Sequence, residues 1–308
     1  MAGYNPGAMS ERIAFIGFGE AGQTIGRGLL AQGVPLCTYD ILFDDPADQG
    51  RLAAKAREMG VAVAASHAEA VRGASLVFLA VTASSSLEAA RSCLPGLAKG
   101  QLFLDINSVS PRRKQETAAL VSPTGAAYVD VAVMAPVAPY GHRVPCLAGG
   151  PGARELMPRA QALGMQVEFV SDDVGQASAI KMFRSILIKG LEALMLESML
   201  AASEYRVEAR VLASLKETFP SLDWEKLSGY LIERVVRHGA RRAAEMREVA
   251  ATLTEIGIEP IMASATAVRQ QWLADLGVKN SVPARVEDRA TLVAAIRRAL
   301  GRTPSTQN

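Results

Sequence analysis

The sequence predicts an α/β fold in which a doubly wound, mainly parallel sheet is followed by an all-α region, and three observations support this prediction. Short apolar runs alternate with helical stretches from Arg12 to about Phe169, which is typical of a parallel sheet with helices on both faces. After Val170 the strand signals stop and helical patterns continue almost to the end. The length of 308 residues exceeds the usual size of one hydrophobic core, so two domains are expected.

The expected strands are short apolar runs bounded by turn residues. Because helices cover both faces of such a sheet, its strands read as nearly continuous apolar segments. We predict strands at 13–16, 36–39, 61–63, 76–81, 102–105 and 128–131, with weaker ones at 146–148 and 166–170.

The helical half begins with capping residues. Ser171 to Asp173 precede a stretch that contains no proline as far as Tyr205, which predicts one long helix. We therefore expect a first domain over 10–170 and a second over 171–301, with a frayed tail. Further helices are expected at 207–218, 223–236, 239–256, 260–276 and 286–300.

Composition excludes several classes of protein. With 49% hydrophobic and 21% charged residues the chain can bury a large core. The 33 basic and 31 acidic side chains leave a charge of +2, too small for a nucleic-acid footprint. Three cysteines stand far apart with no metal-ligand spacing, so they are expected to be reduced thiols and no metal is predicted. Neither a signal peptide nor a membrane span is visible, which indicates a cytoplasmic protein.

The stretch GFGEAG follows the first predicted strand and opens a helix, and in this context GxGxxG is a dinucleotide-binding fingerprint. Gly17 allows the tight turn, Gly19 lets a pyrophosphate approach the backbone, and Gly22 lets the helix lie close to the sheet. The free N–H groups of the first helical turn then face the phosphates. Glycines that serve only packing and turns are the alternative. The cofactor-binding residues expected here are Gly17, Phe18, Gly19, Glu20, Ala21 and Gly22.

Asp40 ends the second predicted strand, where an acidic side chain accepts hydrogen bonds from the adenosine ribose. Its carboxylate would repel a 2′-phosphate, so NAD is favoured over NADP. Arg51 or Lys55 could fold back over the site and make NADP possible. The alternative for Asp40 is that it only caps a loop.

With this fingerprint, a domain of six to eight strands and a long helix leading into a helical half, the chain resembles the β-hydroxyacid dehydrogenases over nearly its whole length. That superfamily includes 6-phosphogluconate and 3-hydroxyisobutyrate dehydrogenases and, more distantly, the imine reductases. The resemblance implies a Rossmann domain and a helical domain for substrate binding and dimerisation. The segment RHGARRAAEM at 237–246 looks like a phosphogluconate-dehydrogenase-like branch.

The stretch GQASAIKMF is similar to the family's segment that carries a catalytic lysine, and it points to Lys181. The resemblance implies that Lys181 acts as general acid or base on the substrate hydroxyl, a role that suits an ammonium whose pKa burial has lowered. Ser185 lies one turn farther along the helix and Arg184 one step around it, both placed to bind substrate. The alternative is that Lys181 only forms a salt bridge at the domain junction.

Three departures from the family pattern limit this inference. Ser185 stands where the family usually has asparagine. Met134, Ala135 and Pro136 replace the serine and two glycines of the family's substrate loop, which suggests a substrate with an apolar or bulky portion, unless Met134 belongs to the core. Glu245 follows Ala244 where a lysine–aspartate pair is usual.

Other candidate contacts lie at the carboxyl ends of strands, where such folds bind ligands. The stretch DINSVSP resembles the family's loop beside the nicotinamide, so Asn107 and Ser108 are implied to contact the nicotinamide ribose or carboxamide, although turn chemistry also explains such a loop. Val81 and Thr82 belong to the same edge. His142 is expected either to contact substrate or to be a solvated loop residue.

Arg234, Arg237 and Arg241 recur at helical spacing. They are expected either to bind a carboxylate or phosphate, or to form a solvated helix face paired with Glu245 and Glu248.

Together these features predict an NAD(P)-dependent oxidoreductase that transfers hydride between nicotinamide and a hydroxyl or carbonyl carbon. An imine reductase is one alternative, and a dinucleotide-binding protein without catalysis is another. A homodimer is expected, because the long helix carries more apolar side chains than one neighbour would cover: Leu191, Leu194, Met195, Leu196, Met199 and Leu200.

Overall fold

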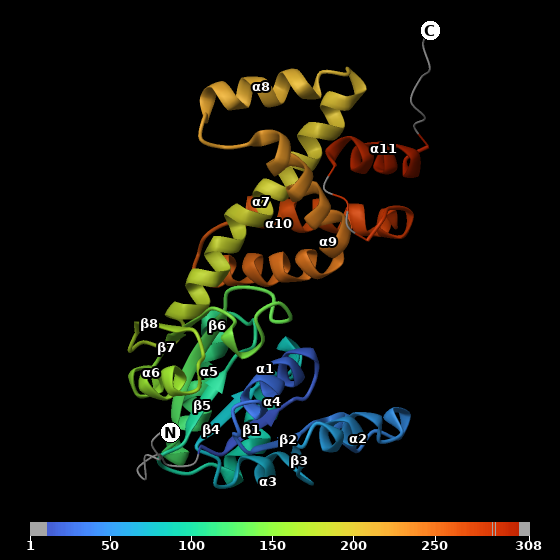
Figure 1. The fold of residues 1–308 in the computed structure, drawn as a ribbon. Coiled ribbons are helices and arrows are strands. Elements are labelled where there is room, and N and C mark those ends of the chain that lie inside the picture. The colour runs from blue at the N-terminus through green and yellow to red at the C-terminus, as the bar shows by residue number, and fades with distance from the viewer. Residues whose placement is uncertain (1–10, 285, 287, 302–308) are drawn as a thin grey trace, which may run out of the picture. The chain divides into compact units, whose positions relative to one another are not determined.

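The computed structural model of the protein describes residues 11–284, 286 and 288–301. The chain divides into two compact units between Lys181 and Met182. The first unit contains an eight-stranded sheet flanked by helices, and the second is helical (Figure 1). This confirms the predicted fold class. The expectations for the first ten residues, and for the tail after residue 301, fall outside the described residues.

The sheet of the first unit has the strand order β3-β2-β1-β4-β5-β6-β7-β8. Strands β1 to β6 run parallel, β7 is antiparallel to β6, and β8 is parallel to β7. β2 and β3 are therefore added on one side of β1, and β4 and the later strands on the other side. The loops after β1 and β4 lie next to each other at one edge of the sheet. The strand bounds are β1 Ile13–Ile16, β2 Leu36–Tyr39, β3 Ala62–Val63, β4 Leu76–Leu79, β5 Leu102–Asp105, β6 Ala127–Val133, β7 Cys146–Gly149 and β8 Val167–Ser171.

Successive side chains of β1 enter two different cores, as the twofold period of a strand requires. Phe15 stacks on Phe78 of β4 at 4.8 Å between ring centroids, and both lie in the core covered by α1, α2 and α6. Ala14 and Ile16 lie in the opposite core, covered by α3, α4 and α5. The helix bounds are α1 Glu20–Leu30, α2 Arg51–Glu58, α3 His67–Val71, α4 Ser86–Cys93, α5 Pro111–Val121 and α6 Ala153–Ala162.

Among its described residues the second unit contains most of α7 and the α-helices α8 to α11, which bury one large and one small apolar cluster. The expected pair of helices at 223–236 and 239–256 is wrong, because α9 runs through both segments without interruption. Gly239 lies inside it, where an added Cβ would stand 2.7 Å from the carbonyl oxygen of Gln270, so close packing against α10 explains this glycine. The bounds are α7 Gln176–Glu204, α8 Glu208–Thr218, α9 Trp224–Glu255, α10 Ile261–Asp275 and α11 Arg289–Ala299.

The boundary between the units lies inside α7 and not before it, so the expected boundary at 170/171 differs from the observed division. Hydrogen bonds explain the difference. The backbone N–H groups of Gly175 and Ser178 donate to the carboxylate of Asp130 in β6, which joins the start of α7 to the sheet.

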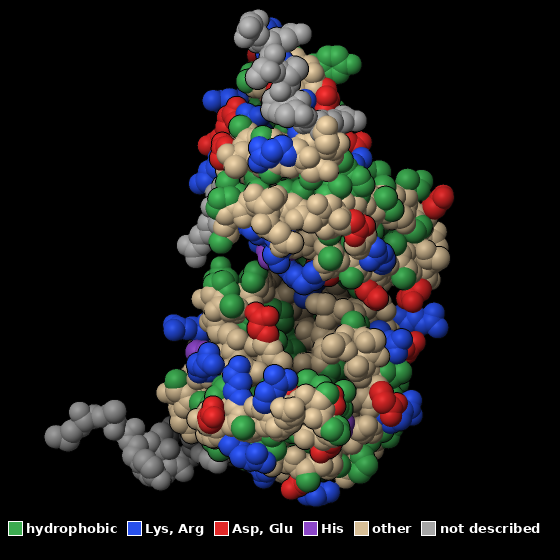
Figure 2. All heavy atoms as spheres, turned by 90° about the vertical axis from the view of Figure 1, so that its right-hand side faces the viewer, with side chains coloured by type: hydrophobic (Ala, Val, Ile, Leu, Met, Phe, Trp, Pro, Cys, Tyr) green, Lys and Arg blue, Asp and Glu red, His purple; other side chains and the backbone are tan. Residues whose placement is uncertain are grey.

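No helix among the described residues is long and apolar enough to cross a membrane. Cys37, Cys93 and Cys146 are buried free thiols, and no group of three metal-ligating side chains occurs within the described ranges. On the face drawn in Figure 2, basic and acidic side chains are interspersed.

Candidate active site

The turn between β1 and α1 requires glycine at position 17, and the first part of α1 requires it at position 22. Gly17 has φ +92°, and a Cβ there would lie 2.4 Å from the carbonyl oxygen of Ala80 in the chain that leaves β4. A Cβ on Gly22 would lie 2.6 Å from the carbonyl oxygen of Gly17. These short distances place the turn directly against the segment that follows β4, and they place α1 directly against the turn.

Gly19 differs from these two glycines, because an added Cβ would meet no atom within 4 Å. It is the N-cap residue of α1 and provides no side-chain hydrogen bond to the first turn. The backbone N–H groups at the start of α1 therefore form a cradle for an anion. The cradle is open on the side where a side chain at position 19 would project. Such a cradle fits a diphosphate, since helix N-termini favour anions and the pyrophosphate must approach the backbone closely.

Asp40, directly after β2, lies against this loop. One oxygen of its carboxylate accepts the N–H of Phe18 at 2.7 Å, and the other accepts the N–H of Leu42 at 3.0 Å. Asp40 therefore both caps the following turn and supports the glycine loop, and each oxygen keeps a further lone pair for a ribose hydroxyl. Arg51, the expected alternative partner of a 2′-phosphate, pairs with Asp48 at 3.7 Å.

Val81 and Thr82 lie just past β4, which ends at Leu79 and is shorter than predicted. A Cβ on Gly17 would stand 2.9 Å from Cγ1 of Val81, so this side chain contacts the glycine turn. The hydroxyl of Thr82 pairs with those of Ser84 and Ser85 at 3.2 and 2.9 Å. Both residues belong to the same sheet edge as the glycine loop.

Lys181 and Ser108 form the second part of the site. The Nζ of Lys181 donates a hydrogen bond to the hydroxyl of Ser108 at 2.6 Å, and Ser108 is exposed in the loop after β5. Asn107 is buried, and its backbone and side-chain N–H groups donate to Asp105 at 3.0 and 2.7 Å. Burial raises the pKa of the Cys146 thiol to about 12, and the nearby Lys181 charge partly opposes that rise.

A fully buried charged network lies behind this pair, and the sequence did not reveal it. Lys114 of α5 forms ion pairs with Asp105 at 3.1 Å and with Asp130 at 3.6 Å, and all three side chains are inaccessible to solvent. The Lys114 ammonium also donates to the carbonyl of Asp105 at 2.5 Å, and the hydroxyl of Tyr128 donates to the Asp105 carboxylate at 2.8 Å. The available signal was an acidic residue in each of two neighbouring apolar strands.

This network supports both partners of the Lys181–Ser108 hydrogen bond. Asp105 binds Asn107, the residue before Ser108. Asp130 caps the first turn of α7, which carries Lys181 one turn farther on. Because Lys114 joins the two carboxylates, the loop after β5 and the start of α7 are held in one rigid arrangement.

The loop after β6 contains Met134, Ala135 and Pro136. The first two are half-buried, Pro136 is exposed, and Ala135 packs on the sheet core. The segment that follows this loop contains His142. The ring of His142 lies so close to α1 that a Cβ on Gly28 would stand 2.0 Å from its Nδ1 atom. The Nε2 atom of His142 lies 2.7 Å from the side-chain nitrogen of Gln32, so this histidine anchors the loop to α1.

The remaining expected site residues belong to the second unit. Arg184 is exposed and Ser185 is half-buried on α7. Glu245 of α9 accepts from Lys189 and from Arg241, both at 2.8 Å, so it is engaged in ion pairs within the helical unit.

Two family models match the chain. Residues 12–108 match the family described as NADP oxidoreductase, coenzyme F420-dependent, and residues 202–273 match a domain of unknown function, DUF1932. The first match covers the glycine loop, Asp40 and Asn107, and the second covers α9 and most of α10.

Solved structures resemble the chain over almost its entire length. A conserved hypothetical protein from Sinorhizobium meliloti 1021 is 37% identical, with a TM-score of 0.82, over 95% of this chain and 97% of its own. A conserved protein of unknown function, described as structurally similar to 3-hydroxyacid dehydrogenases, is 30% identical with a TM-score of 0.75, over 87% of this chain and 98% of its own. The 3-hydroxyisobutyrate dehydrogenase of Mycobacterium tuberculosis shares the fold, with a TM-score of 0.72 and 18% identity over 94% of this chain and 100% of its own.

Proposed function

The chain belongs to the 3-hydroxyacid dehydrogenase-like proteins of the β-hydroxyacid dehydrogenase superfamily, and from this membership we propose that it is an NAD(P)-dependent oxidoreductase acting on CH–OH or C=O groups. Membership itself supports a dinucleotide-binding oxidoreductase. The finer proposal depends on one observation, the hydrogen bond from Lys181 Nζ to the Ser108 hydroxyl at 2.6 Å.

The position of this pair in the sheet supports the proposal. Ser108 follows β5 and the glycine loop follows β1, and one strand, β4, lies between these two. Neighbouring strands are about 4.8 Å apart, so the two loops stand roughly 10 Å apart along one sheet edge. A dinucleotide whose diphosphate lies on the glycine loop can therefore extend toward Ser108.

The residues present fit a nicotinamide dinucleotide. Gly19 and the first N–H groups of α1 would hold the diphosphate, and Asp40 would accept the ribose hydroxyls. We propose NAD as the preferred cofactor, because the Asp40 carboxylate would repel a 2′-phosphate and Arg51 is paired with Asp48. Val81, Thr82 and Asn107 would contact the nicotinamide portion of the cofactor.

A bound nicotinamide supplies or accepts the hydride at the substrate carbon. During reduction the Lys181 ammonium donates a proton to the substrate oxygen, so that C=O becomes CH–OH, and during oxidation the neutral amine takes that proton back. Ser108 accepts a hydrogen bond from Lys181 and fixes the direction of its Nζ. Met134, Ala135 and Pro136 would contact an apolar portion of the substrate.

A homodimer is part of this proposal. Leu187, Leu191 and Leu194 of α7 are 70%, 46% and 55% exposed, and their spacing of four and three residues places them in one row. Such a row can pair with itself across a twofold axis. Of the other side chains expected at a dimer interface, Met195, Leu196 and Met199 are buried within their own unit.

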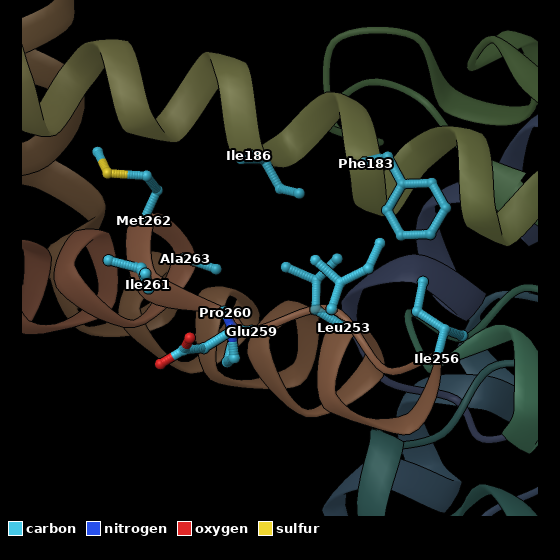
Figure 3. Close-up of a pocket in the computed structure, with 10 residues that line it drawn as sticks. Phe183, Ile186, Leu253, Ile256, Glu259, Pro260, Ile261, Met262 and Ala263 are labelled. Atoms are coloured by element: carbon cyan, nitrogen blue, oxygen red, sulfur yellow. The ribbon is translucent and has the colours of Figure 1, made fainter.

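An apolar groove lies beside this row. Phe183 and Ile186 point from α7 toward Leu253 and Ile256 (Figure 3), and together with Pro260 and its neighbours they line a cavity of about 570 Å³. The groove extends the apolar surface that a second copy would cover. We also propose a cytoplasmic location, since three free thiols fit a reducing compartment.

The test is a turnover assay with NAD and NADP over a panel of hydroxy acids, aryl alcohols and cyclic imines, comparing the wild type with Lys181→Met. We expect the variant to lose at least about 100-fold in kcat, as for removal of a general acid, with unchanged dinucleotide affinity. Lys216→Met on α8, an exposed lysine in the other unit, is the matched control.

Undiminished turnover by Lys181→Met would remove the proposed role of the lysine. Turnover of imines alone would favour an imine reductase. Binding of NADH without turnover over the whole panel would favour a non-catalytic dinucleotide-binding protein.

A further inference from the structure

The helical unit contains a cluster of cations that the redox chemistry does not use. Arg234, His238 and Arg241 lie on α9 at intervals of four and three residues, so they share one face of the helix. Arg242 is their buried neighbour. Lys279 approaches from the 3₁₀ turn Val278–Ser281, whose backbone accepts a hydrogen bond from Arg237 at 3.4 Å. We call these groups, without Arg237, the α9 cation cluster.

The carboxylates around the cluster are fewer than the cations. Three carboxylates form four ion pairs around it: Glu192 binds Arg242 at 3.0 Å, Glu233 binds Arg237 at 3.2 Å, and Glu245 binds both Lys189 and Arg241 at 2.8 Å. Six basic side chains, with Arg234 and Lys279 included, thus face three acidic ones. Within the described residues no ion pair includes Arg234 or Lys279. Burial raises the pKa of the Glu192 carboxyl, and Arg234 lies near enough to oppose that rise, so the excess of cations is only partly balanced.

His238 lies close to this excess charge. Its pKa is lowered to about 4, first by burial and then by the charges of Arg234, Arg241, Arg242 and Lys279, and no carboxylate contributes to the shift. The imidazole is therefore neutral near pH 7 and half-buried among cations.

Some of the guanidinium groups also lack hydrogen-bond acceptors. The Nε atoms of Arg234 and Arg242 are buried and have no acceptor among the described residues. Arg242 is only 7% exposed, so its unpaired N–H group cannot be satisfied by moving freely into solvent. Burial is the main cause that lowers the pKa of Arg242; Glu192 and Glu245 oppose this shift, and Arg234 and Arg241 add to it.

We propose that the α9 cation cluster binds an oxyanion, the carboxylate or phosphate group of a small organic molecule. An anion placed against Arg234, His238 and Lys279 would accept the hydrogen bonds that the chain leaves unmade and would neutralise the excess charge. Guanidinium groups suit this purpose, because their planar donors match the oxygens of carboxylate and phosphate. The inference depends only on the helical unit and is independent of the proposed redox reaction.

The test measures the pKa of His238 by NMR, with inorganic phosphate and with citrate as probes. The chain has three histidines, so a His238→Gln variant assigns the signal. We expect phosphate to raise the pKa of His238 by about one unit or more in a saturable manner, because a bound anion stabilises the imidazolium. Chloride at matched ionic strength should produce a smaller, non-saturating change.

Three variants define the site. Arg234→Gln should weaken phosphate binding at least about tenfold, as expected for loss of a charged hydrogen bond. Lys279→Gln removes a charge from a different element and should also weaken binding. Arg247→Gln is the control, since Arg247 is exposed on α9 and bonded to Gln271 at 3.0 Å.

No saturable shift of His238 up to tens of millimolar phosphate and citrate would overturn the proposal. Equal weakening by Arg247→Gln, or none by Arg234→Gln and Lys279→Gln, would indicate an adventitious ion only and would also overturn it. Circular dichroism of each variant separates loss of binding from loss of folding, and Lys279→Gln keeps the test decisive if Arg234→Gln does not fold.

Discussion

Asp130 holds the start of α7 through Ser178, whose backbone N–H donates to the carboxylate at 3.0 Å and whose hydroxyl donates to it at 2.5 Å. Lys181 lies three residues farther along the same helix. The cap therefore determines where Lys181 stands along the helix axis and in which direction its side chain leaves the helix. We predict that Asp130→Asn lowers kcat about 10- to 100-fold, because small misplacement of a catalytic group is costly. Dinucleotide affinity should be unchanged, since Asp130 does not contact the glycine loop.

The same variant should lower the free energy of unfolding by about 3 kcal/mol, because Lys114 loses one of two buried charged partners. Urea unfolding measures this loss. Asp172→Asn, which breaks the exposed pair with Arg154, is the control and should leave both stability and kcat unchanged. Wild-type kcat in Asp130→Asn would show that the cap does not position Lys181.

Gly19 and Gly22 should respond differently to alanine. A Cβ on Gly19 would meet nothing within 4 Å, so Gly19→Ala should fold with wild-type stability and bind NAD at least about tenfold more weakly. A Cβ on Gly22 would lie 2.6 Å from a backbone oxygen, so Gly22→Ala should lose about 1–3 kcal/mol of stability even without cofactor. Thermal unfolding and NAD titration measure the two effects. If Gly19→Ala and the wild type bind NAD with equal affinity, the diphosphate does not bind at this loop.

Replacing the carboxylate after β2 should change the choice of cofactor. Asp40→Ser removes the negative charge that would repel a 2′-phosphate and retains a hydroxyl for the neighbouring N–H groups. We expect NAD affinity to fall and the ratio of NADP to NAD affinity to rise at least about tenfold, as for gain or loss of one charged interaction. Fluorescence titration with both reduced cofactors measures the ratio. A ratio that does not change would mean that Asp40 only supports the loop.

Charges placed on the apolar row of α7 should dissociate the proposed dimer. Leu191→Glu combined with Leu194→Glu would bury two carboxylates in the interface, which is strongly unfavourable. Light scattering should then give a monomer mass for the double variant and a dimer mass for the wild type. Tyr205→Glu, at a position 82% exposed outside the row, should remain dimeric. A monomeric wild type at micromolar concentration would contradict this prediction.

Acid should weaken the helical unit through His238. The folded pKa is about 4 and the ordinary value is 6.5, so between these values the unfolded chain binds a proton that the folded chain does not. Stability is therefore fully present above pH 6.5 and falls as the pH approaches 4. His238→Gln should show a smaller decrease between pH 7 and 5 in urea unfolding. Identical pH dependence in both proteins would mean that His238 does not titrate abnormally.

The fold could be predicted in detail from local patterns. Buried strands and the glycine fingerprint depend on residues close in sequence, and the predicted strand positions match the eight observed strands within a few residues. The division into two helices at 223–236 and 239–256 failed, because α9 runs through both segments and through Gly239. A tertiary contact with Gln270 explains that glycine, and such a contact leaves no local signal.

The supporting network of the site was not predictable in the same way. Lys114 looks like an ordinary polar residue of an exposed helix, and only the pairing of β5 with β6 brings Asp105 and Asp130 to either side of it. No local pattern marks the carboxylate of Asp130 as the cap of α7. The role of a buried ion pair depends on long-range topology, which periodicity does not encode.

The contact of His142 with Gly28 has a consequence for the history of this protein. A side chain at position 28 would occupy the space of the imidazole, so a residue larger than glycine there requires His142 to be replaced or moved. Among homologous sequences these two positions should therefore have changed together, with an imidazole at one accompanied by glycine at the other. A large alignment of homologous sequences would show this coupling as correlated residues at positions 28 and 142. The correlation would indicate how the loop after β6 became attached to α1.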